Sequence, residues 1–175
     1  MNPAGEDFKR LIRSIPDFPK PGILFRDITT LLSDGNAFRR AIDQLANRFK
    51  NKGITKVVGI ESRGFLTAAP LAYLLGAGFI PVRKKGKLPF QTHSVSYDLE
   101  YGTDTLEMHR DAVLADEKTL VVDDLLATGG TTRATCDLVR SSGAKVAAVC
   151  FLIELTALKG RERLKEFDVF SLITY

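Results

Sequence analysis

The fold is decided by the stretch Val121-Val122-Asp123-Asp124-Leu125-Leu126-Ala127-Thr128-Gly129-Gly130-Thr131-Thr132. Its first half predicts a buried strand that runs into two carboxylates, and its second half predicts a small turn that opens a helix over residues 132–141. Glycines let backbone N–H groups approach an anion closely, so such a turn can hold a phosphate. The two aspartates can accept hydrogen bonds from sugar hydroxyls or face Mg²⁺. The stretch therefore indicates a phosphorylated sugar, with an ordinary strand-to-helix turn and helix cap as the alternative.

Strand and helix patterns alternate outward from this stretch. The spacing of apolar residues from Phe38 to Phe49 predicts a helix with one buried face. Pro70 is expected to kink or delay a second helix, and Pro81 to place its strand near a sheet edge. Between residues 36 and 153 the other predicted elements are strands at 56–60, 79–82, 119–122 and 146–153 and a helix at 65–75. This alternation predicts an α/β fold with a mostly parallel twisted sheet flanked by helices, which binds ligands outside the carboxyl ends of its strands.

The segments around this alternating part are less regular. Residues 84–112 lack a core-like apolar run, so we expect a solvent-facing hairpin or a mobile flap around Gly102. A short helix is predicted before the proline-rich break at 16–22, because four apolar residues share helical spacing: Phe8, Leu11, Ile12 and Ile15. The remaining expectations are extended or turning chain at 23–32, a short charged helix at 158–167 and a final strand at 169–175.

Length and composition bound the class of protein. The 175 residues suit a single domain, 1–175, since single cores stop growing at roughly 250–300 residues. The net charge of +4 permits an anionic ligand without requiring nucleic acid. No run of 18 apolar residues and no signal-peptide pattern occur, so we expect no membrane partner and a cytoplasmic location. Cys136 and Cys150 lie in apolar segments and are expected to be buried, outside any disulfide or zinc site. The G-x-x-x-x-G-K-[ST] and G-x-G-x-x-G motifs are absent, which disfavours P-loop and dinucleotide sites.

Further segments carry a resemblance to a known family. The stretch at 121–132 resembles the phosphoribosyl pyrophosphate signature of type I phosphoribosyltransferases. Five other segments resemble the adenine phosphoribosyltransferase family in the same order along the chain: 17–28, 61–65, 83–89, 97–102 and 154–161. The similarity runs from about residue 12 to the C-terminus. The resemblance implies the type I phosphoribosyltransferase fold with a small N-terminal hood at 1–35, a mobile flap at 84–112 and a homodimer.

The reaction that this resemblance implies joins adenine to phosphoribosyl pyrophosphate and gives AMP and pyrophosphate, with Mg²⁺ as cofactor. The metal is expected to be held mainly through the substrate and water, with no certain direct protein ligand. Breaking the C1–O bond builds oxocarbenium character on the ribose. The site must therefore stabilise charge on the departing pyrophosphate and exclude water.

The resemblance also implies roles for individual residues. Glu100 is the candidate catalytic residue for handling a proton, and Asp123 and Asp124 would bind the ribose hydroxyls directly or through metal-bound water. Glu61 departs from the family, which often has Asp there, so it receives no role. The other expected ligands are Ala127, Thr128, Gly129, Gly130 and Thr131 for the 5-phosphate; Ser62, Arg63, Arg83, Lys87 and Tyr101 for pyrophosphate; and Leu24, Phe25, Arg26 and Leu125 for adenine.

Two other functions stay open at this point. A phosphoribosyltransferase for guanine or hypoxanthine, xanthine or orotate would share the sugar site, but segments 25–27 and 99–101 argue against it. A purine-operon regulator would sense the sugar diphosphate through the same turn. However, about 35 residues precede the first core helix, too few and too proline-broken for an obvious DNA-binding module. Pyrophosphate release in the presence of adenine separates an enzyme from such a sensor.

Overall fold

The computed structural model describes residues 3–98 and 102–175. Its main feature is a seven-stranded sheet with the strand order β5-β6-β4-β3-β7-β8-β9. These strands are β3 (Lys56–Ile60), β4 (Gly78–Lys84), β5 (Thr92–Asp98), β6 (Thr103–His109), β7 (Lys118–Leu126), β8 (Lys145–Glu154) and β9 (Val169–Thr174). Two further strands, β1 (Arg13–Pro16) and β2 (Leu24–Asp27), form a separate antiparallel pair.

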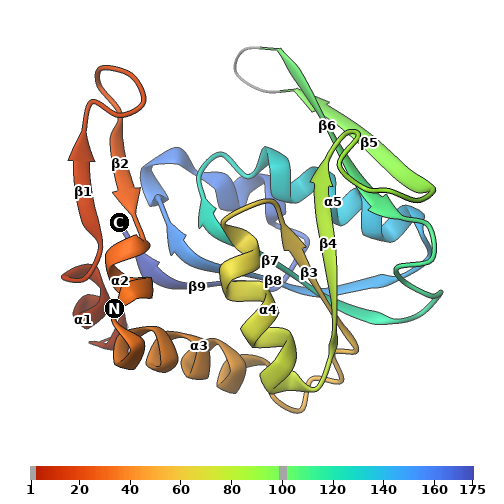
Figure 1. Ribbon diagram of the computed structural model, residues 1–175, viewed down its shortest axis with the longest axis horizontal. Helices are drawn as coiled ribbons and strands as arrows, with labels where there is room; N and C mark the ends of the chain where they lie inside the picture. Colours follow the sequence, from red (N-terminus) through yellow and green to blue (C-terminus); the bar gives the residue numbers. More distant parts are fainter. Residues whose placement is uncertain (1–2, 99–101) are drawn as a thin grey trace.

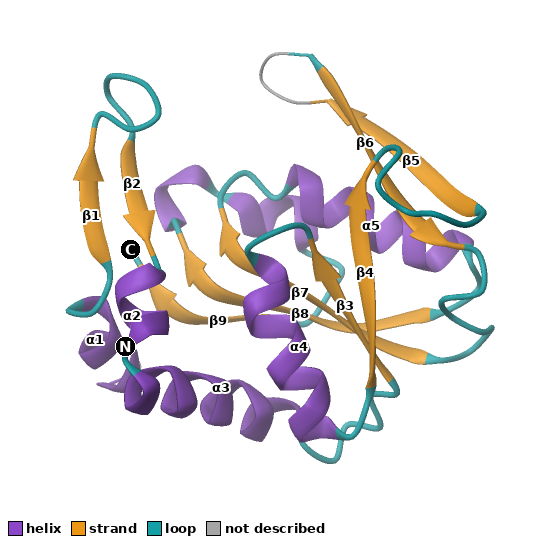
Figure 2. Cartoon of the chain, in the orientation of Figure 1, coloured by secondary structure: helices purple, strands orange, loops and turns teal. Residues whose placement is uncertain are grey.

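Helices cover both faces of the main sheet, with α4 in front of it and α5 behind it in Figure 2. The helices are α1 (Pro3–Lys9), α2 (Thr29–Ser33), α3 (Gly35–Phe49), α4 (Gly64–Leu75) and α5 (Gly130–Ser141), with 3-10 helices η1 (Thr156–Leu158) and η2 (Gly160–Leu164). The side chains of successive β3 residues pack in two different cores, because side chains alternate between the two faces of a sheet along a strand. Val57 packs in the core that α3 and α4 close, and Val58 packs in the core that α5 closes.

The strand directions confirm the predicted α/β class. β3 pairs in parallel with β4 and β7, and β8 pairs in parallel with β7 and β9. Only the pairings of β6 with β4 and β5 are antiparallel within this described sheet. Because β4 and β7 lie on opposite sides of β3, the strand order reverses there, and ligands bind outside the carboxyl ends at such reversals. In Figure 1 the β1–β2 and β5–β6 hairpins stand on either side of these strand ends.

The N-terminal segment differs from the prediction. α1 ends at Lys9, and Ile15 lies in β1 opposite Phe25 rather than on a helix. Phe8 is buried, but the helical spacing of the apolar residues after it does not come from one continuous helix. Within the chain at 23–32 that was expected to be extended or turning, residues 24–27 form β2 and the short helix α2 follows at 29–33. The Asp27 carboxylate accepts hydrogen bonds from the backbone N–H and the hydroxyl of Thr29, at 2.9 and 2.7 Å, at the start of α2.

The helix and the strand that contain prolines differ from the prediction. α4 begins at Gly64 and continues through Pro70, so Pro70 does not delay the start of the helix, and it lacks the N–H that another residue at this position would have donated. Pro81 lies in β4, which is an interior strand. It is tolerated there because β6 pairs with β4 only at Arg83 and Lys84, beyond the proline.

The later segments match the prediction in part. Residues 92–98 and 103–109 form the expected hairpin, but Leu106 and Met108 are buried, so β6 belongs to the core of the sheet. The chain at 158–167 forms short 3-10 turns rather than one helix, and the final strand is confirmed as β9. Cys136 and Cys150 are buried and free, as expected. No helix in the described residues is long and apolar enough to cross a bilayer.

Candidate active site

A cavity of about 420 Å³ lies where β3 and β7 end, at the reversal of strand order. It brings together six of the predicted site residues from three separate parts of the chain: Ser62, Arg63, Asp123, Asp124, Leu125 and Thr131. The other lining residues are Ile60, Glu61, Lys84, Tyr97, Asp104 and Leu106. The cavity therefore joins the loop after β3, the end of β7 and the start of α5, as expected for a ligand site in a parallel sheet.

Of the acidic pair at the end of β7, Asp124 is buried and Asp123 is half-buried. Burial raises the pKa of Asp123 well above its ordinary value, and the charge of Asp124 raises it further. Burial also raises the pKa of Asp124, while Arg63 opposes that shift from 3.0 Å, the distance between its Nε and Asp124 Oδ2. Gly64 leaves room for the pair, because a Cβ there would lie 2.8 Å from Asp123 Oδ1. Two carboxylates with one guanidinium partner favour a further cation or hydroxyl donors.

The turn from β7 into α5 has the backbone geometry of an anion site. Gly129 is the N-cap of α5 with φ of 81°, which favours glycine. The first N–H groups of any helix lack intrahelical partners and can donate to an anion. Gly160 packs against this turn: a Cβ on Gly129 would lie 2.6 Å from Gly160 O, and a Cβ on Gly160 would overlap the carbonyl oxygen of Ala127. The hydroxyls of Thr131 and Tyr97 are hydrogen-bonded at 3.3 Å, so the turn also contacts β5.

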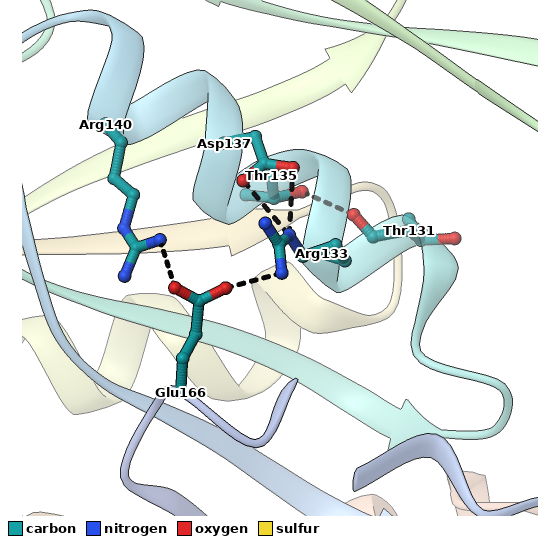
Figure 3. A network of polar contacts seen from close by, with 6 residues as sticks. All are labelled: Thr131, Arg133, Thr135, Asp137, Arg140 and Glu166. Carbon is teal, nitrogen blue, oxygen red and sulfur yellow. Dashed lines mark hydrogen bonds and ion pairs between the residues drawn. The ribbon is translucent and has the colours of Figure 1, made fainter. Parts of the chain in front are cut away.

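A polar network orients the start of α5, as Figure 3 shows. Arg133 binds Asp137 within the helix and reaches Glu166, which follows η2. Arg140 binds the same Glu166 carboxylate at 2.6 Å. The Thr135 hydroxyl donates to the carbonyl of Thr131 at 2.9 Å. Because the charged side chains are partly exposed, each pair contributes modestly, but together they attach the helix to the segment before β9.

The basic segment after β4 is organised around Glu61. Glu61 Oε1 accepts from Lys87 Nζ at 2.6 Å and from Arg83 Nη2 at 3.2 Å, and Oε2 accepts from the Lys84 N–H at 2.9 Å. Burial alone would raise the pKa of Glu61, but these hydrogen bonds lower it to about 2. Lys84 Nζ lies 2.9 Å from Asp104 Oδ2. Arg83 and Lys87 thus contact Glu61, which lines the cavity, while Lys84 lines the cavity itself.

The expected adenine residues Leu24, Phe25 and Arg26 lie on β2 of the small hairpin. Phe25 is half-buried, and the Arg63 guanidinium lies 5.1 Å from the centroid of its ring. Arg26 stacks on the ring of Tyr175 at 3.8 Å. Since Arg63 also binds Asp124, it joins the hairpin to the acidic pair.

Comparison with known proteins gives the family. The pattern of the phosphoribosyl transferase domain matches residues 28–174. The chain belongs to the phosphoribosyl transferase domain family. An adenine phosphoribosyltransferase of Chloroflexus aurantiacus is 58% identical over 170 residues, which are 97% of this chain and 98% of that protein. The crystal structure of the adenine phosphoribosyltransferase of Thermoanaerobacter pseudethanolicus is 53% identical with a TM-score of 0.94, covering 97% of this chain and 99% of that one.

A more distant structure carries ligands. The Saccharomyces cerevisiae adenine phosphoribosyltransferase, complexed with an imino-altritol bisphosphate and adenine, is 38% identical with a TM-score of 0.92 and covers 99% of this chain and 100% of that one. These findings confirm the predicted family and the type I phosphoribosyltransferase fold.

Two of the predicted site residues, Glu100 and Tyr101, lie outside the described residues. Several other residues of this phosphoribosyltransferase site were not predicted from the sequence. Lys84 and Tyr97 line the cavity and fell within recognised motifs, but they received no role. Asp104 gave no sequence signal, since its place beside Lys84 depends on the pairing of β6 with β4. Gly160 fell within the recognised segment 154–161 but received no role, because its contact with the phosphate turn joins residues far apart in sequence.

Proposed function

We propose that this chain transfers the 5-phosphoribosyl group of phosphoribosyl pyrophosphate to N9 of adenine, releasing AMP and pyrophosphate. The observation that carries the proposal is the glycine turn at 127–131 beside the Asp123–Asp124 pair, at the strand-order reversal of the family's fold. Relatives named adenine phosphoribosyltransferase, 58% identical in the case of Chloroflexus aurantiacus, support adenine as the base. The reaction is a purine-salvage step, because it converts a free base into a nucleotide.

The roles follow from charge and position. Asp123 and Asp124 would accept hydrogen bonds from the ribose hydroxyls, and the turn at 127–131 would hold the 5-phosphate through backbone N–H groups and threonine hydroxyls. Arg63 would bind pyrophosphate, with the other expected pyrophosphate ligands Ser62, Arg83, Lys87 and Tyr101. Glu100 would handle the proton of the purine ring; this role and that of Tyr101 depend on the motif at 97–102 alone.

The base would lie between β2 and the end of β7. Phe25 offers an aromatic face, and Leu125 offers apolar surface in the cavity. Backbone groups of Leu24 and Arg26 would contact the edge of the ring. Such contacts separate a 6-amino from a 6-oxo purine, because hydrogen-bond donors and acceptors exchange places between them.

Mg²⁺ is the proposed cofactor. The Asp123–Asp124 pair fits a cation, since a positive charge would offset the burial and the repulsion by Asp124 that together raise the pKa of Asp123. Among the described residues no group of three or more His, Cys, Asp or Glu side chains could hold a metal ion. We propose that the ion is held mainly through substrate and water. When bound, the ion would neutralise charge on the pyrophosphate. We expect EDTA to abolish AMP formation and added Mg²⁺ to restore it; undiminished turnover in EDTA would refute the requirement.

The experiment that tests the function is turnover of phosphoribosyl pyrophosphate with Mg²⁺ against adenine, hypoxanthine, guanine, xanthine and orotate. Nucleotide and pyrophosphate are measured together. We expect AMP from adenine alone. Turnover with a different base would keep the sugar site and reject the assigned base residues. Binding of the sugar diphosphate without release of pyrophosphate would indicate a sensor.

We also propose that the chain forms a homodimer and is located in a reducing cytoplasm. Helix α4 and strand β4 carry exposed apolar side chains, with Leu66, Tyr73 and Leu74 exposed to 47%, 85% and 48% and Phe79 to 36%. Large exposed apolar side chains of this kind are typical of an interface, and a second copy of the chain is the proposed partner. Light scattering should give twice the monomer mass, and a monomer mass at micromolar concentration would refute it. The free, buried cysteines fit a reducing compartment.

A further inference from the structure

Glu61, which the sequence left without a role, lies at the centre of the basic segment. We propose that Glu61 is a positioning residue that holds Arg83 and Lys87 while no leaving group is bound and yields them to pyrophosphate. The inference depends on the proposed function, because it assigns those two cations to pyrophosphate. The Glu61 side chain is only 8% exposed, and its Oε1 lies 3.2 Å from Arg83 Nη2 and 2.6 Å from Lys87 Nζ.

Glu61 also shapes the loop that carries these cations. The Lys84 N–H donates to Glu61 Oε2, and the Gly86 N–H donates to Glu107 Oε2, both at 2.9 Å. Arg83 Nη1 donates to the carbonyl of Lys87 at 3.2 Å. The loop is therefore folded around two buried carboxylates, and among the described residues Glu61 is the one whose carboxylate pairs with the side chains of both Arg83 and Lys87.

The charges of this cluster favour exchange with an anion. The basic segment keeps an excess positive charge, because it carries four cations, Arg83, Lys84, Lys85 and Lys87, against the three carboxylates of Glu61, Asp104 and Glu107. The Nε of Arg83 is buried without a hydrogen-bond partner among the described residues, and it remains able to donate. Glu61 stays ionised at neutral pH, because its pKa is lowered to about 2. Pyrophosphate must therefore compete with a fixed negative charge for the same donors.

This competition predicts the effect of removing the charge. Glu61→Gln keeps the side-chain length and an oxygen that can accept from the Lys84 N–H, but it no longer competes with pyrophosphate for the cations. We expect Mg²⁺-pyrophosphate to bind roughly tenfold more tightly, since one unit charge a few ångströms away has an effect of this order after screening. A residue that only supports the loop would weaken binding when replaced.

Calorimetric titration of the full chain with pyrophosphate and Mg²⁺ tests the inference, because it needs neither adenine nor turnover. Glu61→Asp, which keeps the charge, should bind nearly as the natural protein does. Glu107→Gln is the matched control, since it removes a buried carboxylate of β6 that accepts a hydrogen bond from the same loop without pairing with Arg83 or Lys87 in the described residues, and it should change the dissociation constant far less. In turnover, Glu61→Gln should lower both KM for phosphoribosyl pyrophosphate and kcat, because product leaves more slowly.

The outcomes separate the inference from the proposed function. Unchanged or weaker pyrophosphate binding by Glu61→Gln would overturn the inference, and so would equal tightening by Glu107→Gln. A natural protein that binds no pyrophosphate would overturn it as well. A natural protein that binds pyrophosphate but forms no AMP from adenine would reject only the proposed activity.

Discussion

Asp123→Asn is expected to remove most of the turnover while making the folded protein more stable at neutral pH. The loss of activity follows from the proposed contact with the ribose hydroxyls, and a reduction in kcat/KM of about 10²-fold is typical for one preorganised polar contact. The gain in stability follows from burial. Asp123 is half-buried beside the buried Asp124, and both burial of its carboxyl and the charge of Asp124 raise its pKa. Asparagine has nearly the same shape and no charge, so the variant avoids the free-energy cost of keeping a charged carboxylate at this position.

The gain in stability should depend on pH. An acid whose pKa is higher in the folded than in the unfolded chain loses folding stability as the pH rises from its ordinary value, here 3.8, towards the folded value. Below pH 3.8 both states are protonated, and the group contributes nothing. The difference in Tm between Asp123→Asn and the natural protein should therefore be small near pH 4 and increase towards neutral pH. Thermal unfolding in a series of buffers measures it.

Asp124→Asn is the matched comparison. It also removes a buried carboxylate, but it leaves Arg63 without the partner that lies 3.0 Å away. Its gain in Tm should therefore be smaller than that of Asp123→Asn, whereas its turnover should fall as well. An Asp123→Asn variant with the same change in Tm at pH 4 and pH 8 would contradict the electrostatic explanation. Full turnover by that variant would contradict the role of Asp123.

The local pattern of the sequence was sufficient for the parallel part of the fold. Buried strands with apolar runs, such as β3 and β8, and the amphipathic α3 carry signals that tertiary contacts reinforce. The errors occurred where a partner strand decides the outcome. Ile15 has helical spacing from Phe8, yet pairing with Phe25 makes it part of β1. Pro81 is permitted in an interior strand because β6 reaches β4 only beyond it.

The candidate site could be predicted where one short segment contains the chemistry. The acidic pair and the glycine turn are such a segment, and the cavity contains Asp123, Asp124 and Thr131. Residues that act through distant contacts could not be found in this way. Glu61 is 22 residues from Arg83 and 26 from Lys87, and only the register of β3 with β4 brings them together. Asp104 meets Lys84 for a similar reason.

Gly160→Ala is expected to reduce activity strongly, because Gly160 packs against the phosphate turn although it lies outside the segment 121–132 that contains the turn. A Cβ on Gly160 would overlap the carbonyl oxygen of Ala127 and lie 2.7 Å from Leu126 Cδ1. The oxygen belongs to the backbone, so Gly160→Ala must displace the turn that is proposed to hold the 5-phosphate. A displacement approaching 1 Å at a positioning group costs about 10²-fold in rate. We expect a fall of this size in kcat/KM for phosphoribosyl pyrophosphate, mostly through KM, measured well below the Tm of the variant.

Gly35→Ala is the control for the Gly160→Ala experiment. Gly35 begins α3 and has nothing within 4 Å of an added Cβ, so alanine should leave turnover unchanged and stabilise the chain by about 0.4–1 kcal/mol. Gly160→Ala should instead lose about 1–3 kcal/mol through overpacking. A loss of stability alone would leave KM unaltered in the molecules that remain folded. An increased KM with most molecules folded therefore identifies displacement of the turn, and an unaltered KM would show that the turn does not depend on Gly160.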